Sequence, residues 1–217
     1  PAPVPPSTHS PMSQLAPIRV SIIIPCTDSL VIPSIQLALR HQVDSGGSIE
    51  VLLVGSDRHQ LIQPAKNVRF IPTGSEAACA SDKRNLGMQA ARGAYFLFLD
   101  DDCVPDPGWL QGLLGHLLRG KAVVGGSVRF DRNNYLQMAD NLSAFHDLLP
   151  YTPAGIRPYL ATANLGVCRS VVEQVGFMPP GKNRADDLEW TQRMRAHGYS
   201  LFFEPSASIR HDPPRRT

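Results

Sequence analysis

The chain has 217 residues, of which 42% are hydrophobic and 18% charged, a composition typical of an ordinary soluble globular protein. Its net charge of only +2 argues against nucleic acid or an acidic membrane as an electrostatic partner. No apolar run approaches the roughly 20 residues needed to span a bilayer, and the proline-rich start lacks the pattern of a signal peptide.

The first half of the chain predicts strands that alternate with helices. Residues 1–17 carry six prolines and predict a disordered tail or linker, so the fold is expected to begin at about residue 18. Apolar and β-branched runs predict strands at 18–25, 49–54, 67–71 and 95–99, with helices at 30–42 and 77–92. This alternation favours an α/β fold with a mainly parallel central sheet flanked by helices, in which ligands bind beyond the carboxyl ends of the strands.

The second half is more irregular. It predicts helices at 106–118, about 136–148, 169–175 and 186–197, and strands at 122–130, 161–168, 201–203 and 206–209. The last short strands suggest a small second sheet. Residues 212–217 are expected to form a tail.

Three consecutive carboxylates, Asp100, Asp101 and Asp102, follow the apolar strand at 95–99. Their mutual repulsion is costly unless a hard divalent cation offsets it, and oxygen ligands suit magnesium or manganese. In a strand-like geometry Asp100 and Asp102 would share one side while Asp101 points away and tolerates substitution better. We expect Asp102 on the metal and Asp100 on the ribose or, through water, on the metal. The alternative is a solvated acidic turn that caps the next helix.

A second acidic pair, Asp186 and Asp187, begins the helix predicted at 186–197. One carboxylate would act as a general base that takes the proton of an acceptor hydroxyl, and the other would orient it. The alternative is a pair that merely favours the dipole of the helix.

Two isolated residues are further candidates. His211 follows the last predicted strand, and a neutral imidazole can ligate a divalent metal, although a histidine near a terminus is often simply solvated. Arg84 begins the helix before the acidic strand, and its donor fork suits phosphate or ribose oxygens, although it can equally be a surface charge.

The sequence lacks the motifs of dinucleotide-dependent dehydrogenases, P-loop nucleotide-binding proteins and serine hydrolases. The first strand is followed by CTDS, not by G-x-G-x-x-G, and neither a Walker-type phosphate loop nor a G-x-S-x-G elbow is present. The four cysteines (Cys26, Cys79, Cys103 and Cys168) contain no C-x-x-C pair, which argues against a metal or redox site built on them. We interpret them as reduced, mostly buried thiols of a cytoplasmic protein.

The order of these motifs resembles the family-2 inverting glycosyltransferases, which have the GT-A (nucleotide-diphospho-sugar transferase) fold. The resemblance covers about residues 18–211 and is most specific in KRNLGMQAARGAYFLFLDDDCVPDPGWL, where Asp100 and Asp102 match the outer members of a D-x-D motif. It implies a nucleotide-binding half at 18–105 and an acceptor and catalytic half at 106–211.

The resemblance also implies roles for individual residues. Asp187 takes the position of the catalytic base, Asp186 replaces the usual glutamate beside it, and Asp102 and His211, together with Asp100, hold Mn²⁺ or Mg²⁺. The candidates for binding the nucleotide-sugar are Pro25, Cys26, Thr27, Asp57, Arg84, Asp100, Asp101 and Asn164.

Two departures from the family pattern bear on the substrate. The acidic pair expected after the second strand is replaced by Val54-Gly55-Ser56-Asp57, so that Asp57 is only a weak substitute for the residue that reads the base. A Q-x-x-R-W motif and membrane helices are missing, which favours transfer of a single sugar over processive synthesis.

The sequence therefore predicts a metal-dependent transferase for a UDP-, GDP- or dTDP-sugar and an unidentified acceptor, which can be a glycan, lipid, natural product or peptide. The acceptor site is expected in residues 131–160, where aromatic residues such as Phe145 stack on the acceptor or pack locally. The alternatives are a nucleotide-sugar-binding module without turnover and a sugar nucleotidyltransferase.

Overall fold

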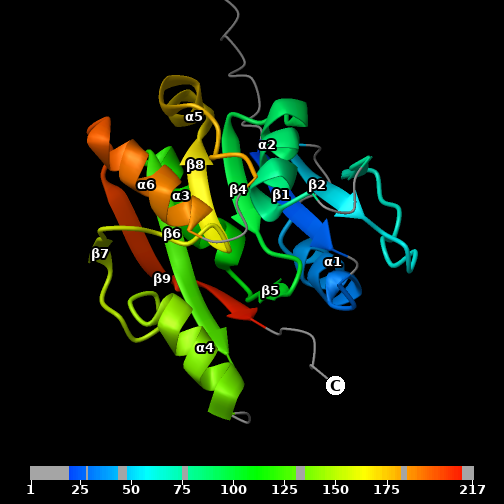
Figure 1. The fold of residues 1–217 in the computed structure, drawn as a ribbon, viewed down its shortest axis with the longest axis horizontal. Helices are drawn as coiled ribbons and strands as arrows, with labels where there is room; N and C mark the ends of the chain where they lie inside the picture. Colours follow the sequence, from blue (N-terminus) through cyan, green and yellow to red (C-terminus); the bar gives the residue numbers. More distant parts are fainter. Residues whose placement is uncertain are drawn as a thin grey trace, which may run out of the picture.

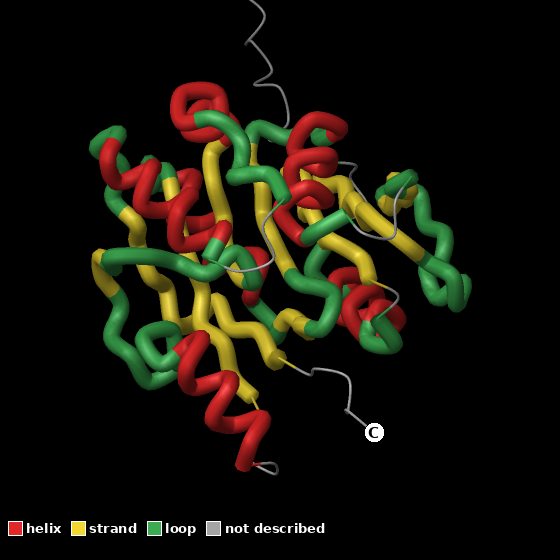
Figure 2. The backbone as a smooth tube through the Cα atoms, in the orientation of Figure 1, coloured by secondary structure: helices red, strands yellow, loops and turns green. Residues whose placement is uncertain are grey.

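A computed structural model describes residues 20–27, 29–43, 48–74, 78–130, 135–181 and 185–211, and the tails expected at 1–17 and 212–217 lie outside these residues. Within these residues, nine strands form one sheet in the order β3-β2-β1-β4-β8-β6-β9-β5, with β7 paired to β9 (Figures 1 and 2). The strands are β1 (Val20–Thr27), β2 (Ile49–Ser56), β3 (Val68–Pro72), β4 (Tyr95–Leu99), β5 (Cys103–Pro105), β6 (Val123–Phe130), β7 (Gly155–Ile156), β8 (Asn164–Cys168) and β9 (Leu201–His211). The helices are α1 (Ile32–Arg40), α2 (Ala80–Ala90), α3 (Trp109–Leu118), α4 (Tyr135–Phe145), α5 (Arg169–Val175) and α6 (Asp186–Ala196).

Helices cover both faces of the sheet. Strand β1 shows why its sequence is continuously apolar: Ile22 and Ile24 face one buried cluster and Ile23 faces the other. Helices α1 and α3 pack into the first cluster, while α2, α5 and α6 pack into the second. Helices α2 and α6 lie in front of the sheet in Figure 1. The α/β architecture with a central sheet flanked by helices, expected from the sequence, is therefore confirmed.

The pairing of the strands is parallel in one half of the sheet and mixed in the other. Strands β3, β2, β1 and β4 run parallel, which brings the carboxyl ends of β1, β2 and β4 to the same edge. Strand β8 is antiparallel to both β4 and β6, and β9 is parallel to β6. The acidic residues that follow β4 thus lie at the edge where α/β sheets bind ligands.

The end of the chain differs from the expected pattern. The two short strands predicted at 201–203 and 206–209 are one strand, β9, which continues through a register shift opposite Gly126 and Ser127. Strands β5 and β7, which were not expected, pair with β9 in the central sheet, so the strands do not form a separate small sheet. The irregularity in β9 is a bulge that interrupts the pattern without ending the strand.

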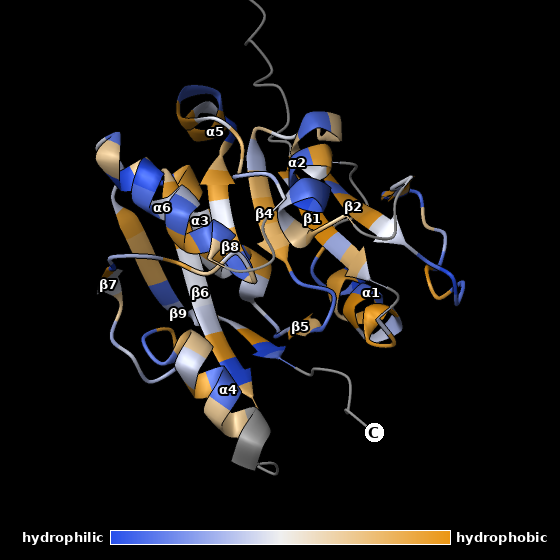
Figure 3. Cartoon of the chain, viewed as in Figure 1, coloured by the Kyte–Doolittle hydropathy of each residue, from blue (hydrophilic) through white to orange (hydrophobic). Residues whose placement is uncertain are grey.

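The hydropathy of the residues agrees with this packing. Figure 3 shows hydrophobic colour along the central strands and mostly hydrophilic colour on α6, which covers the sheet with only its inner side. Within the described ranges, no helix is both long enough and apolar enough to cross a membrane.

Candidate active site

The acidic triplet lies in a turn. Strand β4 ends at Leu99, and the backbone N–H of Cys103 donates to the carbonyl of Asp100 at 3.1 Å. The expected alternation of strand side chains therefore does not apply. Instead, each of the three carboxylates pairs with a different element of the fold: Asp102 with β9, Asp101 with β1 and Asp100 with α2.

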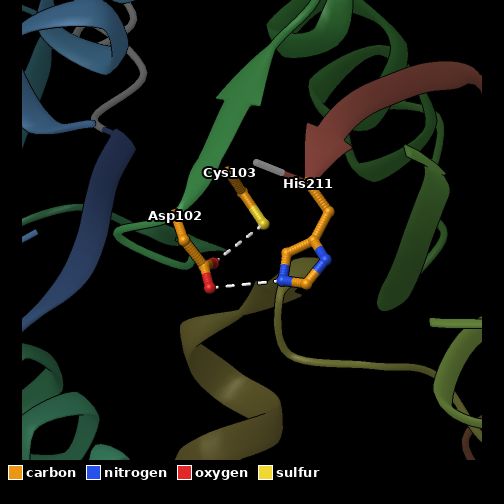
Figure 4. Close-up of side chains that lie close together, drawn as sticks. All are labelled: Asp102, Cys103 and His211. Carbon is orange, nitrogen blue, oxygen red and sulfur yellow. Dashed lines mark hydrogen bonds and ion pairs between the residues drawn. The ribbon is translucent and has the colours of Figure 1, made fainter. Parts of the chain in front are cut away.

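Asp102 faces His211, 109 residues away in the chain, as Figure 4 shows. Strands β5 and β9 bring them together, because Cys103 pairs directly with His211 in the sheet. The Nε2 atom of His211 lies 3.2 Å from Oδ2 of Asp102. Burial of Asp102 acts to raise its pKa, but the hydrogen bond and charge of His211 outweigh burial and hold that pKa below its usual value.

The thiol of Cys103 completes this group but is a poor metal ligand. Its Sγ atom donates to Oδ1 of Asp102 across 3.4 Å. Burial, followed by the neighbouring carboxylates, raises the pKa of this thiol well above its usual value, so it stays protonated.

The remaining donors fit a small divalent cation. In the described part of the chain, Asp102, Cys103 and His211 are the cluster of metal-ligating residue types whose ligand atoms all lie within 4.8 Å of one another. Two adjacent ligands of an octahedral ion with bonds of about 2.1 Å are about 3.0 Å apart. The 3.2 Å between Nε2 of His211 and Oδ2 of Asp102 matches that spacing. A carboxylate and an imidazole are also suitable ligands for Mn²⁺ or Mg²⁺.

Asp101 does not point into solvent. Its side chain is buried, and its Oδ2 atom accepts from the backbone N–H of Thr27 at 2.6 Å and from the Thr27 hydroxyl at 2.8 Å. It therefore ties the turn after β4 to the end of β1. Since replacement of Asp101 would remove the acceptor of both Thr27 donors, we expect it to be tolerated less well than the strand pattern predicted.

Asp100 pairs with Arg84, and Arg84 also reaches the second acidic pair. The guanidinium of Arg84 is 4% exposed, forms a short ion pair with Asp100 and lies 3.3 Å from Oδ2 of Asp186. Burial opposes its charge, but Asp100 and Asp186 outweigh burial and raise the pKa of Arg84. Arg84 is thus a buried bridge between two acidic motifs, where the sequence suggested a surface charge or a donor contact.

Asp187 stands at the start of α6 with a more basic carboxylate than usual. Its pKa is raised, mainly by burial, although the backbone N–H of Leu188 donates to its Oδ1 at 2.8 Å. Ala185, immediately before the pair, has a φ of 60°, a left-handed conformation that is costly for alanine. The chain enters α6 through this strained residue, which directs Asp186 inward to Arg84.

The residues expected along the nucleotide divide into buried and accessible ones. Pro25 and Cys26 are buried in β1, and burial raises the pKa of the Cys26 thiol far above its usual value, so only Thr27 is exposed there. The carbonyl of Cys26 accepts from Nζ of Lys83 at 2.8 Å. Asp57 accepts from the backbone N–H groups of residues 61 and 62, at 2.7 and 3.2 Å, and so closes its own loop.

Asn164 is a structural residue. It is buried, and its Oδ1 accepts from the indole N–H of Trp109 at 2.8 Å. Its Nδ2 donates to the carbonyls of Ser127 and Ala207 at 2.9 and 2.8 Å. Its amide oxygen and both amide protons are engaged in holding α3, β6 and β9 together, so its expected role in donor binding is not supported.

Two residues at the site were not expected from the sequence. Lys83 precedes Arg84 on α2, is buried and supports the end of β1. Asn141 on α4 contacts His211, its Oδ1 lying 2.9 Å from Nδ1 of the imidazole. The position of Lys83 next to Arg84 was a weak sequence signal that it lies at the site. No feature of the polar region 131–160 distinguished Asn141 from its neighbours.

Known proteins that are similar to the chain in sequence include two glycosyltransferases. The chain is 36% identical over 121 residues to the glycosyltransferase AglE of Haloferax volcanii, covering 55% of this chain and 40% of AglE. It is 30% identical over 139 residues to the pre-mycofactocin glycosyltransferase of Mycobacterium tuberculosis, covering 59% of this chain and 29% of that protein. The chain thus spans less than half the length of either relative.

Solved structures share the fold. A structure of residues 1–349 of S. aureus TarS superposes with a TM-score of 0.70 at 12% identity, covering 90% of this chain and 60% of that one. A structure of GalNAc-T7 with UDP, GalNAc and Mn²⁺ also gives 0.70, at 13% identity, with 90% and 44% covered. The GT-A fold expected from the motifs is confirmed. The family model for glycosyl transferase family 2 matches residues 21–176, and the chain therefore belongs to that family.

Proposed function

We propose that this chain is the catalytic part of a metal-dependent inverting glycosyltransferase that moves a single sugar from a nucleotide-diphosphate sugar to an acceptor hydroxyl. The observation that carries the proposal is the grouping of three sets of functional residues at one edge of the sheet. These are the Asp102–His211 pair, the Arg84 bridge from Asp100 to Asp186, and the basic carboxylate of Asp187. Membership of family 2 and the names of the curated relatives support it.

Asp102 and His211 would hold the divalent cation next to the diphosphate. When bound, Mn²⁺ or Mg²⁺ would neutralise charge that develops on the departing nucleoside diphosphate. The Mn²⁺ and UDP in the GalNAc-T7 structure support this assignment, although the donor base of the present chain is left open by its Gly55-Ser56-Asp57 sequence. Thr27, exposed at the end of β1, would line the nucleotide.

Asp187 would act as the general base. Its carboxylate takes the proton of the acceptor hydroxyl as that oxygen forms a bond to the anomeric carbon. The bond from the anomeric carbon to the diphosphate oxygen breaks on the opposite face, so the configuration is inverted. The raised pKa of Asp187 makes it a stronger base than an exposed aspartate. Asp186 would keep the start of α6, and with it Asp187, in place through its ion pair with Arg84.

Nucleotide binding tests the metal half of this proposal. Calorimetry with UDP, GDP and dTDP, each with Mn²⁺ and with EDTA, should show binding of at least one nucleotide that requires the metal. Asp102→Asn should lose that binding, while Asp106→Asn, whose carboxylate pairs with Arg129 instead, should retain it. Metal-independent binding in the unmodified protein, or full retention in Asp102→Asn, would remove Asp102 from the metal site.

A further inference from the structure

Helix α4 contacts the imidazole of His211 at two points. Asn141 and Phe145 lie four residues apart and therefore on the same face of the helix. Oδ1 of Asn141 lies 2.9 Å from Nδ1 of His211, and the ring of Phe145 packs edge-on against the imidazole with centroids 5.6 Å apart. One nitrogen and one face of the ring are thus held by a single element, while Nε2 is turned to Asp102.

We propose that α4 is the element that prepares His211 for metal binding, with Asn141 as the positioning residue that selects its tautomer. The inference rests on the proposed function, because it concerns the metal site assigned there. It adds to that function a residue, and a whole helix, that the sequence pattern did not connect with the metal.

The chemistry of the Asn141 amide and the His211 imidazole explains how the tautomer is selected. An amide oxygen only accepts, so a neutral His211 must place its proton on Nδ1 to satisfy Asn141. Nε2 then carries the lone pair, as a metal ligand requires. In the other tautomer Nδ1 and the amide oxygen would be two acceptors facing each other at 2.9 Å. Asn141 therefore disfavours the tautomer in which Nε2–H would simply donate to Asp102.

The surroundings of Asn141 suit a positioning role. Its side chain is 5% exposed, so solvent does not replace the amide readily. The segment that follows α4 is fixed to the sheet, because the backbone N–H of Val128 on β6 donates to the carbonyl of the buried Leu148 at 2.8 Å. The backbone N–H of Leu148 in turn donates to the carbonyl of Phe145, the last residue of α4, at 2.8 Å. Asn141 is thus presented to His211 from a supported helix, as outer partners of metal ligands usually are.

The experiment measures Mn²⁺ affinity and determines which nitrogen of the His211 imidazole carries the proton. Titration of Mn²⁺ alone, followed by electron paramagnetic resonance, would be applied to the unmodified chain and to Asn141→Leu, Asn141→Asp, His211→Ala and Ser143→Ala. Asn141→Leu removes the acceptor at similar volume, whereas Asn141→Asp keeps an oxygen there. Ser143→Ala changes the exposed side of the same helix and serves as the control.

The expected result is that Asn141→Leu weakens Mn²⁺ binding about 10- to 100-fold, the range for partners of metal-ligating histidines. Asn141→Asp should bind at least as tightly as the unmodified chain, and Ser143→Ala should bind equally well. Long-range ¹H–¹⁵N spectra of the unmodified, metal-free chain, recorded at a pH where the imidazole of His211 is neutral, should show its proton on Nδ1. This measurement needs no variant and holds even if Asn141→Leu fails to fold.

Two results would overturn the inference, and they differ in what else they affect. If His211→Ala weakens Mn²⁺ binding but Asn141→Leu does not, or if neutral His211 carries its proton on Nε2 in the metal-free chain, the role of Asn141 is wrong and the metal site stands. If His211→Ala itself leaves Mn²⁺ binding unchanged, the proposed metal site is wrong and the role of Asn141 falls with it.

Discussion

Replacement of Arg84 by methionine should destabilise the protein strongly, because it leaves two carboxylates without their shared cation. Loss of one partner from a buried ion pair typically costs about 3–5 kcal/mol. The lower end applies here for two reasons. Asp100 keeps 29% of its side-chain surface in water, and within the described residues Nε of Arg84 is buried without an acceptor, which already weakens the native arrangement. We therefore expect Arg84→Met to lower the free energy of unfolding by about 3 kcal/mol.

Urea denaturation of Arg84→Met, Asp186→Asn and the double variant measures this bridge. Because the two residues are in contact, the double variant should lose less than the sum of the single losses, by about 1–3 kcal/mol. Arg40→Met, at an exposed position on α1, is the matched control and should change stability by no more than about 0.5 kcal/mol. A loss below about 1 kcal/mol for Arg84→Met, or strict additivity with Asp186→Asn, would refute the reasoning.

Three further predictions concern other residues. The rate of transfer should fall as the pH drops through the raised pKa of Asp187, since only the ionised carboxylate accepts a proton; a pH–rate profile that stays flat down to the ordinary aspartate range contradicts this. Asn164→Leu should lower the free energy of unfolding by at least about 3 kcal/mol in urea, because it removes three buried hydrogen bonds; an unchanged midpoint would contradict its structural role. Burial acts to raise the pKa of Glu50, but hydrogen bonds from Arg92, Ser21 and Arg69 outweigh burial and lower it. The stability that Glu50 contributes is therefore complete above the ordinary pKa of about 4.3 and is lost as the pH falls below it. Glu50→Gln should consequently lower the melting temperature at pH 7 more than at pH 4, and equal shifts would disagree.

The part of the fold that the sequence predicted well is the part where local pattern and global environment agree. Strand β1 is apolar at consecutive positions because both of its faces are buried, so the pattern directly reports a central strand. Strands β2 and β4 follow the same logic. The bulge in β9 and the two-residue strand β7 carry no such pattern, because their pairing depends on partners more than 40 residues away.

The same distinction applies to the candidate site. The pairing of Asp102 with His211 followed from the motif order, and the structure brings the two together. The orientations of Asp101 and Arg84 did not follow, because the turn after β4 ends the alternation of side chains and the partners, Thr27 and Asp186, lie 74 and 102 residues away. Sequence identified the charged groups, whereas their pairing is a property of the tertiary structure.

Asp187 provides the most direct test of the central claim, that this edge of the sheet catalyses sugar transfer. The measurement is release of nucleoside diphosphate from UDP-, GDP- and dTDP-sugars with Mn²⁺, by the unmodified chain and by Asp187→Asn, with nucleotide affinity measured in parallel. We expect turnover of at least one donor by the unmodified chain. For Asp187→Asn we expect undiminished nucleotide binding without turnover. Turnover by Asp187→Asn at the unmodified rate, or binding without turnover in both proteins, would contradict it.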